Sequence, residues 1–165
     1  MQADNRTTLI YLVVGLILGR NVQLAKIAEQ VNYEYKESSL EDRFRRFVSN
    51  NQIEVMVTFS IFVKLMLKSL DEGQPVVLSI DSSKSGGNCL TLMISHGYKS
   101  RALPLCWVTF KGKKGHSSQE IQLSLFKAVK ALLPDPKEII LLGDGEFDGS
   151  ELVSWFEAQP GWQYV

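Results

Sequence analysis

Few cysteines and histidines occur in this 165-residue sequence, and it carries no net charge. Cys89 and Cys106 stand apart in apolar surroundings and form no CxxC pair. They are therefore expected to be small buried residues, not disulfide or metal ligands. His96 and His116 are too few and too isolated for a zinc site. Basic and acidic residues number 18 each, so any argument for nucleic-acid binding must rest on local clusters.

Long apolar runs are missing as well. The run from Leu9 to Leu18 is too short to span a bilayer. Asp4 precedes it and no small-residue cleavage site follows, so a buried first helix is favoured over a signal peptide. No GxxxxGK[ST] phosphate loop is present. We expect a cytoplasmic protein without a membrane segment, and the composition, 45% hydrophobic and 22% charged, is typical of a globular core.

Helical spacing dominates residues 1–73. The third of four expected helices carries Leu40, Phe44 and Phe47 on one face. The expected helices run from a cap at Thr7 or Thr8 to Gly19, over Val22–Val31, from a cap at Ser38 or Ser39, and over Ile53–Leu70. The turn-rich stretch 71–75 then predicts a boundary between a domain at 1–73 and another at 74–165.

Strand patterns alternate with helical ones in residues 74–165, which predicts an α/β domain. The expected order is three strands, a helix, a strand, a helix and a strand. These elements cover Val76–Ile80, Cys89–Ser95, Ala102–Phe110, a helix capped by Ser117 or Ser118 and ending at Leu133, Glu138–Leu142, Gly149–Ala158, and a strand opening at Trp162. A domain seldom stops where an apolar strand has just begun, so we expect a truncated product.

Two aspartates share one context in this pattern. Asp81 and Asp144 each follow an apolar strand and precede glycine- or serine-rich chain. If the two strands are neighbours, both carboxylates meet at one edge of the sheet, where Mg²⁺ or Mn²⁺ suits hard oxygen ligands. Either aspartate alone is better explained as a turn residue or helix cap. The pair in this order indicates a metal site.

Four stretches in order resemble the DDE-type insertion-sequence transposases of the insertion-sequence-four group. Together they span essentially the whole chain. They are Gly19-Arg20 with Asp42-Arg43-Phe44-Arg45-Arg46-Phe47; Leu78-Ser79-Ile80-Asp81-Ser82-Ser83; Ala102-Leu103-Pro104-Leu105-Cys106-Trp107 with Lys113-Lys114-Gly115-His116-Ser117; and Leu141-Leu142-Gly143-Asp144-Gly145-Glu146-Phe147-Asp148-Gly149. The last stretch is similar to the family's Asp-Arg-Glu-Phe motif, with Gly145 in place of the arginine.

The resemblance implies an N-terminal helical DNA-binding-like subdomain and an incomplete ribonuclease-H-like catalytic domain. It implies Mg²⁺-dependent cleavage and strand transfer of double-stranded DNA at insertion-sequence ends, by a homodimer in the full-length synaptic complex. Asp81 and Asp144 correspond to the first two members of the Asp-Asp-Glu triad. The glutamate lies on a later helix of the family, in a Tyr-Arg-Glu-Lys-type motif that these residues lack. Glu146 is not expected to replace it, so this chain alone is expected to be inactive.

Two basic clusters are candidates for DNA contact. Arg43, Arg45 and Arg46 share the predicted third helix, where the phenylalanines face inward and leave the arginines outside. The second cluster follows the third strand and consists of Lys111, Lys113, Lys114 and His116. A solvated helix face and a lysine loop kept for solubility are the competing interpretations. The three tryptophans, Trp107, Trp155 and Trp162, are expected in the core and not as base-stacking platforms.

Three functions follow from this reading. The first is a transposase fragment. The second is a catalytically inactive DNA-binding remnant that regulates an intact transposase. The third is a metal-dependent nuclease of the same fold that works elsewhere without strand transfer.

Overall fold

The computed structural model describes residues 3–31, 36–70, 73–112, 117–133 and 138–165. These residues form two compact units, 1–55 and 56–165. No single helix among the described residues is long and apolar enough to cross a membrane, and the first two helices pass such a test only as a pair bent by 90°.

Three helices build the first unit, here called the helical unit. They are α1 (Ala3–Gly19), α2 (Leu24–Gln30) and α3 (Glu37–Val48). Their shared core contains Ile27, Ala28, Val31, Leu40 and Phe44. A Cβ atom at Gly15 of α1 would lie 2.6 Å from Ile27 Cγ2, so only glycine allows this close approach of the two helices.

Two helix starts in this unit differ from those predicted. Helix α1 begins at Ala3, so Thr8 lies inside it and its hydroxyl donates to the Asp4 carbonyl at 2.8 Å. Helix α3 is preceded by Lys36 as its N-cap residue, without a capping side chain, so neither Ser38 nor Ser39 is the cap. A serine beside an acidic helix start resembles a cap in the sequence, but the backbone enters the helix earlier. The expected helix ends near Gly19 and Val31 agree with the structure to within one residue.

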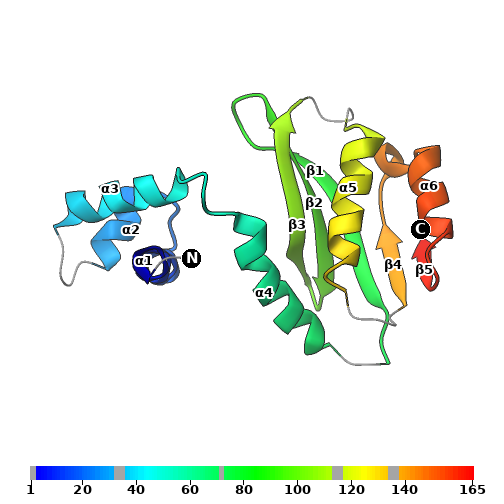
Figure 1. Ribbon diagram of the computed structural model, residues 1–165, viewed down its shortest axis with the longest axis horizontal. Helices are drawn as coiled ribbons and strands as arrows, with labels where there is room; N and C mark the ends of the chain where they lie inside the picture. The colour runs from blue at the N-terminus through cyan, green and yellow to red at the C-terminus, as the bar shows by residue number, and fades with distance from the viewer. Residues whose placement is uncertain (1–2, 32–35, 71–72, 113–116, 134–137) are drawn as a thin grey trace. The chain divides into compact units, whose positions relative to one another are not determined.

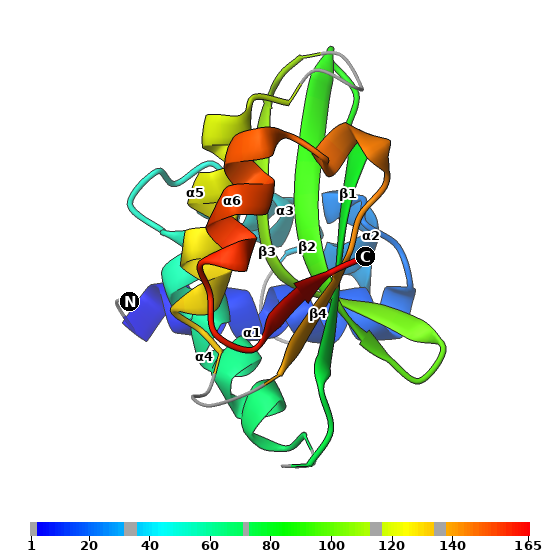
Figure 2. The ribbon, with the colours of Figure 1, turned by 90° about the vertical axis from the view of Figure 1, so that its right-hand side faces the viewer.

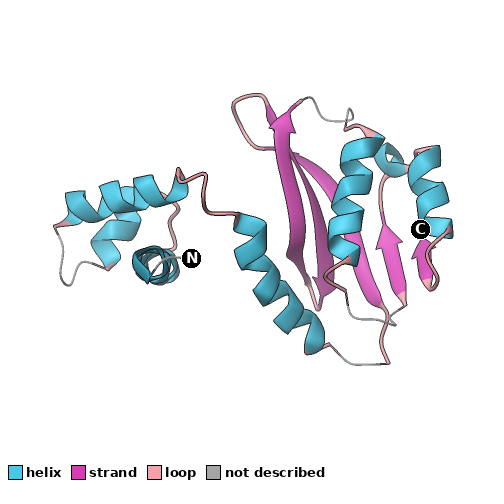
Figure 3. Cartoon of the chain, in the orientation of Figure 1, coloured by secondary structure: helices cyan, strands magenta, loops and turns pink. Residues whose placement is uncertain are grey.

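A five-stranded mixed sheet forms the second unit, here called the sheet unit (Figure 1; Figure 3). The strand order is β3-β2-β1-β4-β5. Neighbours β1/β2 and β2/β3 are antiparallel, whereas β1/β4 and β4/β5 are parallel. The elements are α4 (Val55–Lys68), β1 (Val76–Lys84), β2 (Cys89–Tyr98), β3 (Arg101–Lys111), α5 (Gln119–Lys130), β4 (Ile139–Leu142), η1 (Gly145–Phe147), α6 (Ser150–Glu157) and β5 (Trp162–Tyr164). The predicted succession of strands and helices is confirmed.

Helices α5 and α6 lie on the same side of this sheet (Figure 2). Alternate residues of the central strands, such as Leu78, Ile80 and Leu92, are buried in the core that these helices complete. Ser118 caps α5 by accepting a hydrogen bond from the Ile121 amide at 3.4 Å, as the sequence predicts. The sheet therefore has one face packed against helices, consistent with the alternating burial along β1.

Helix α4 belongs with the sheet and not with the preceding helices. The units divide at 55/56, earlier than the boundary expected after Gly73. Val63 and Leu67 of α4 are buried in the sheet unit's core. The periodicity of α4 identifies it as a helix, but its packing partner depends on tertiary contacts.

Two of the three tryptophans, Trp155 and Trp162, pack against the core as the sequence predicts, whereas Trp107 is half-buried. Trp155 and Trp162 meet edge to face with ring centroids 5.5 Å apart, and both lie against the core. Trp107 makes a similar contact with Phe59 of α4 at 5.1 Å. Both cysteines are free: Cys106 is buried and Cys89 half-buried. Burial raises the pKa of the Cys106 thiol above its ordinary value, which keeps it protonated.

Candidate metal and DNA site

Asp81 lies inside β1 and not at its end. The strand continues to Lys84, and Asp81 is paired with Met93 of β2. The predicted end at Ile80 was wrong because the polar residues that follow still pair with β2 as an antiparallel hairpin. Only residues 85–88 remain between β1 and β2.

Asp144 follows β4 after one glycine, as predicted. It is also the N-cap residue of η1, and its Oδ1 accepts a hydrogen bond from the Glu146 amide at 3.0 Å. Asp144 is therefore a helix cap, which is the competing interpretation of this aspartate in the sequence. A cap uses one carboxylate oxygen and leaves the other for a further ligand.

The sheet brings the two aspartates to the same edge. Strands β1 and β4 are parallel neighbours, and their last paired residues are Ser79 and Leu142. Asp81 and Asp144 each lie two residues beyond that pair. Both are exposed, and neither forms an ion pair within the described part of the chain. The juxtaposition expected from the strand pattern is confirmed at the level of the backbone.

The carboxylate of Asp81 faces the open side of the sheet. It lines a shallow hollow of about 290 Å³ whose other lining residues are Ser79, Ser83, Thr91, Met93, Ser95 and Ala102. Asp144 is not one of them. Over residues 3–31, 36–70, 73–112, 117–133 and 138–165, no group of three or more His, Cys, Asp or Glu side chains is placed to hold a metal ion. Two hard oxygen donors still suit Mg²⁺, which is commonly bound through one or two carboxylates and several waters.

Glu146 has partners that the sequence did not reveal. Its two carboxylate oxygens accept hydrogen bonds from the hydroxyls of Ser82 and Ser117, each at 2.9 Å. Ser82 is only 2% exposed. The one signal in the sequence for a buried hydroxyl is the position of Ser82 in the continuation of an apolar strand. That position does not identify the partner, Glu146, which is 64 residues away.

Tyr164 of β5 stands beside the Asp144 segment. Its hydroxyl donates to the Phe147 carbonyl at 3.1 Å. Burial, and then the negative charges of Asp148 and Asp144, raise the pKa of this phenol above its ordinary value. The Tyr164 hydroxyl thus links β5 to η1, and it remains protonated at neutral pH.

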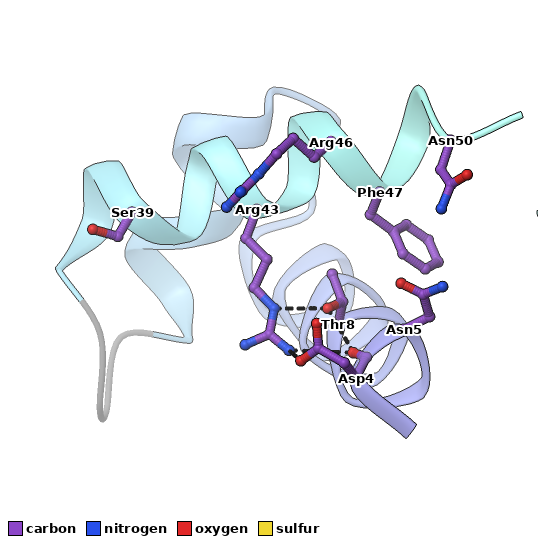
Figure 4. A pocket seen from close by; sticks show the side chains of 8 residues that line it. All are labelled: Asp4, Asn5, Thr8, Ser39, Arg43, Arg46, Phe47 and Asn50. Atoms are coloured by element: carbon purple, nitrogen blue, oxygen red, sulfur yellow. Dashed lines mark hydrogen bonds and ion pairs between the residues drawn. The ribbon is translucent and has the colours of Figure 1, made fainter. Parts of the chain in front are cut away.

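The arginines of α3 do not form one exposed basic face. Arg43 turns toward α1, where its guanidinium donates to the Thr8 hydroxyl at 2.7 Å and pairs with Asp4 (Figure 4). Its side chain is 18% exposed, so the prediction that it points outward is wrong. It joins the two helices by donating to the oxygen of the buried Thr8 hydroxyl, whose own proton is directed to the Asp4 carbonyl.

Arg45 and Arg46 are exposed, as predicted. Arg45 forms an ion pair with Glu41 one turn earlier at 2.6 Å. Arg46 forms no ion pair among the described residues and donates to the Asp42 carbonyl at 3.3 Å. It borders a polar hollow of about 460 Å³ that Asn5 and Asn50 also line (Figure 4). Within this helix, Arg46 is the cation best available to an external anion.

The second basic cluster continues a stretch of sequence that also contains Lys99 and Arg101, and the sheet topology separates these two residues from Lys111. Lys99 and Arg101 lie at the hairpin of β2 and β3, at the end where β1 begins. Lys111 pairs with Cys89 at the opposite end, beyond Asp81, where Lys84 of β1 also lies. Lys113, Lys114 and His116 lie outside the described residues. Lys111 is therefore placed at the same end of the sheet as the aspartates, together with Lys84, which the sequence argument had not used.

Comparison with known protein families finds no family model that matches the chain, and comparison with curated proteins finds no match.

Proposed function

We propose that this chain is the front part of a DDE-type transposase with a ribonuclease-H-like catalytic domain. In this proposal Asp81 and Asp144 hold Mg²⁺, or Mn²⁺ in its place, for cleavage and joining of DNA strands. The observation that carries it is the register of β1 and β4, in which both aspartates lie two residues past the last paired residues. The order of strands and helices in the sheet unit also supports it.

The local chemistry suits a divalent cation. Two exposed carboxylates at one edge, without a cationic side chain paired to either among the described residues, form a region of negative charge. A metal bound there would supply activation of an attacking hydroxyl and stabilisation of the leaving oxygen of a phosphodiester. In the family a third carboxylate on a later helix completes the site, and residues 1–165 contain no counterpart of its motif.

DNA contact is proposed for two places, one in each unit. On α3, Arg45 and Arg46 are the exposed cations, and Arg46 has no acidic partner within the described residues. At the rim of the sheet, Lys84 and Lys111 lie beyond Asp81, where they can neutralise phosphates near the proposed metal.

A metal titration tests the aspartate pair. Mn²⁺ binding to the 165-residue chain is followed by electron paramagnetic resonance for the unmodified protein, Asp81→Asn and Asp144→Asn. Each substitution should weaken Mn²⁺ binding by more than about tenfold, because an amide is a poor replacement for a ligating carboxylate. Glu157→Gln, an exposed acid at the end of α6, is the matched control and should change nothing. Equal Mn²⁺ binding in all four proteins would refute the site.

A DNA-binding protein without catalysis is the second candidate. The observation that favours it is that no group of three or more His, Cys, Asp or Glu side chains among the described residues is placed to hold a metal ion. In that case the chain binds double-stranded DNA through α3 with an affinity that metal does not change. Binding that is enhanced by Mg²⁺ in the unmodified chain but not in Asp81→Asn favours the first proposal.

A further inference from the structure

Glu146 joins three segments that are distant in the sequence. Its Oε2 accepts a hydrogen bond from the hydroxyl of Ser82 in β1. Its Oε1 accepts a hydrogen bond from the hydroxyl of Ser117, the residue before the N-cap of α5. Glu146 itself lies in η1, directly after β4. One side chain therefore ties together the strand that carries Asp81, the start of α5 and the segment that carries Asp144.

A buried amide sets the direction of these hydrogen bonds. Gln122 of α5 is 1% exposed, and its Nε2 donates to the Ser117 hydroxyl oxygen at 2.9 Å and to the Ser117 carbonyl at 3.3 Å. Because the Ser117 oxygen accepts from the amide, its own proton is directed to Glu146. The network is thus Gln122 to Ser117 to Glu146, with Ser82 donating from the other side.

One atom of the Gln122 amide lacks a hydrogen bond in this arrangement. The Oε1 atom of Gln122 is buried without a hydrogen-bond partner within the described structure. Turning the amide over would place that oxygen against the Ser117 carbonyl, so that two acceptors would face each other. The orientation that leaves Oε1 unpaired is the one that lets Ser117 donate to Glu146.

The same residue controls Asp144 through its backbone. The Glu146 amide donates to Asp144 Oδ1 at 3.0 Å, so fixing Glu146 also fixes the aspartate carboxylate. Both carboxylate oxygens of Glu146 already have serine donors. Glu146 is therefore engaged in holding the segment.

We infer that Glu146 is a positioning residue that holds Asp144 in register with the Asp81 strand through Ser82, Ser117 and Gln122. This inference rests on the proposed function only where it concerns metal binding. Glutamine at position 146 preserves the shape and can accept from one serine while donating to the other. Alanine removes both side-chain hydrogen bonds, to Ser82 and Ser117, and keeps the backbone amide of residue 146.

Two variants of the full chain separate positioning from metal ligation. Hydrogen exchange of the residue-146 amide, measured by NMR without metal, should accelerate in Glu146→Ala and stay near the unmodified rate in Glu146→Gln. Mn²⁺ binding should fall by about 10- to 100-fold in Glu146→Ala, the range found when groups supporting a metal ligand are removed. In Glu146→Gln it should stay within about threefold, well short of that range. Glu157→Ala is the control for loss of an exposed acid.

The outcomes are distinct. Loss of Mn²⁺ binding in Glu146→Gln as large as in Asp144→Asn would make Glu146 a metal ligand and overturn the inference. Unchanged amide exchange in Glu146→Ala would overturn it as well. If Asp81→Asn and Asp144→Asn leave Mn²⁺ binding unaltered, the proposed metal site fails, and the exchange rates still decide whether Glu146 holds the segment.

Discussion

The helical unit and the sheet unit differ in whether their clustered charged side chains form ion pairs. On α3 of the helical unit, Arg43 pairs with Asp4 and Arg45 pairs with Glu41. At the edge of the sheet unit, Asp81 and Asp144 are exposed and have no ion-pair partner among the described residues. In the helical unit the ion pairs involve the arginines of α3, whereas the two unpaired carboxylates are available to the cation that we propose.

This difference changes what the two charge clusters in the sequence mean. Three arginines within four positions look like a DNA-binding face, yet Arg43 is used to join α1 to α3. Two aspartates 63 positions apart in the sequence do not look like a cluster, yet the parallel pairing of β1 and β4 places them at one edge. Adjacency in the sequence is a poor guide to which charges act together.

The largest expected effect comes from removing a core aromatic in each unit. Phe44→Ala and Phe126→Ala should each cost about 3–5 kcal/mol, because both side chains are fully buried. At typical stabilities per residue, the 55-residue helical unit has about 3–8 kcal/mol in total and the sheet unit about twice that. Hydrogen exchange should therefore show Phe44→Ala unfolding α1–α3 while β1–β4 stay protected, and Phe126→Ala leaving the sheet weakened but folded. Loss of protection throughout the chain in Phe44→Ala would show that the units fold as one.

A smaller effect separates the two kinds of arginine. Arg43→Ala should destabilise the helical unit by about 1–2 kcal/mol, since it leaves the buried Thr8 hydroxyl without this donor. Arg46→Ala should leave thermal stability unchanged. Instead, it should weaken DNA binding and reduce, by about one, the slope of the logarithm of the binding constant against the logarithm of the salt concentration. Thermal melting and DNA titrations at several salt concentrations measure both; a stability loss in Arg46→Ala equal to that of Arg43→Ala would contradict the distinction.

The smallest effect concerns the Tyr164 hydroxyl. Because its pKa is raised in the folded protein, the stabilisation is complete below the unfolded value of about 10 and is lost as the pH rises through the folded pKa. Tyr164→Phe should cost about 1 kcal/mol at neutral pH through the lost bond to the Phe147 carbonyl. The stability of Tyr164→Phe should decline less between pH 9 and 11 than that of the unmodified chain, as denaturant titrations at each pH would show; parallel declines would exclude Tyr164 as the titrating group.

The secondary structure of this chain follows closely from local patterns. The alternation and apolar runs of residues 74–165 predict the strands and helices in their observed order, and Ser118 is a cap in both sequence and structure. Errors occur where a distant partner decides the outcome. The strand through Asp81 continues because β2 pairs with it, and α4 joins the sheet because Val63 and Leu67 are buried there.

The candidate site is predictable only in part. Asp81 and Asp144 follow from their position near the carboxyl ends of apolar strands, a local property of the sequence. The partners of Glu146 do not, because Ser82 and Ser117 are 64 and 29 residues away and neither carries a distinguishing pattern. Periodicity, caps and turns act over a few residues, and the sequence by itself determines them. Strand pairing, the turning of Arg43 toward α1 and the bonds that hold the Asp144 segment depend on contacts between distant residues, and only the tertiary structure decided those.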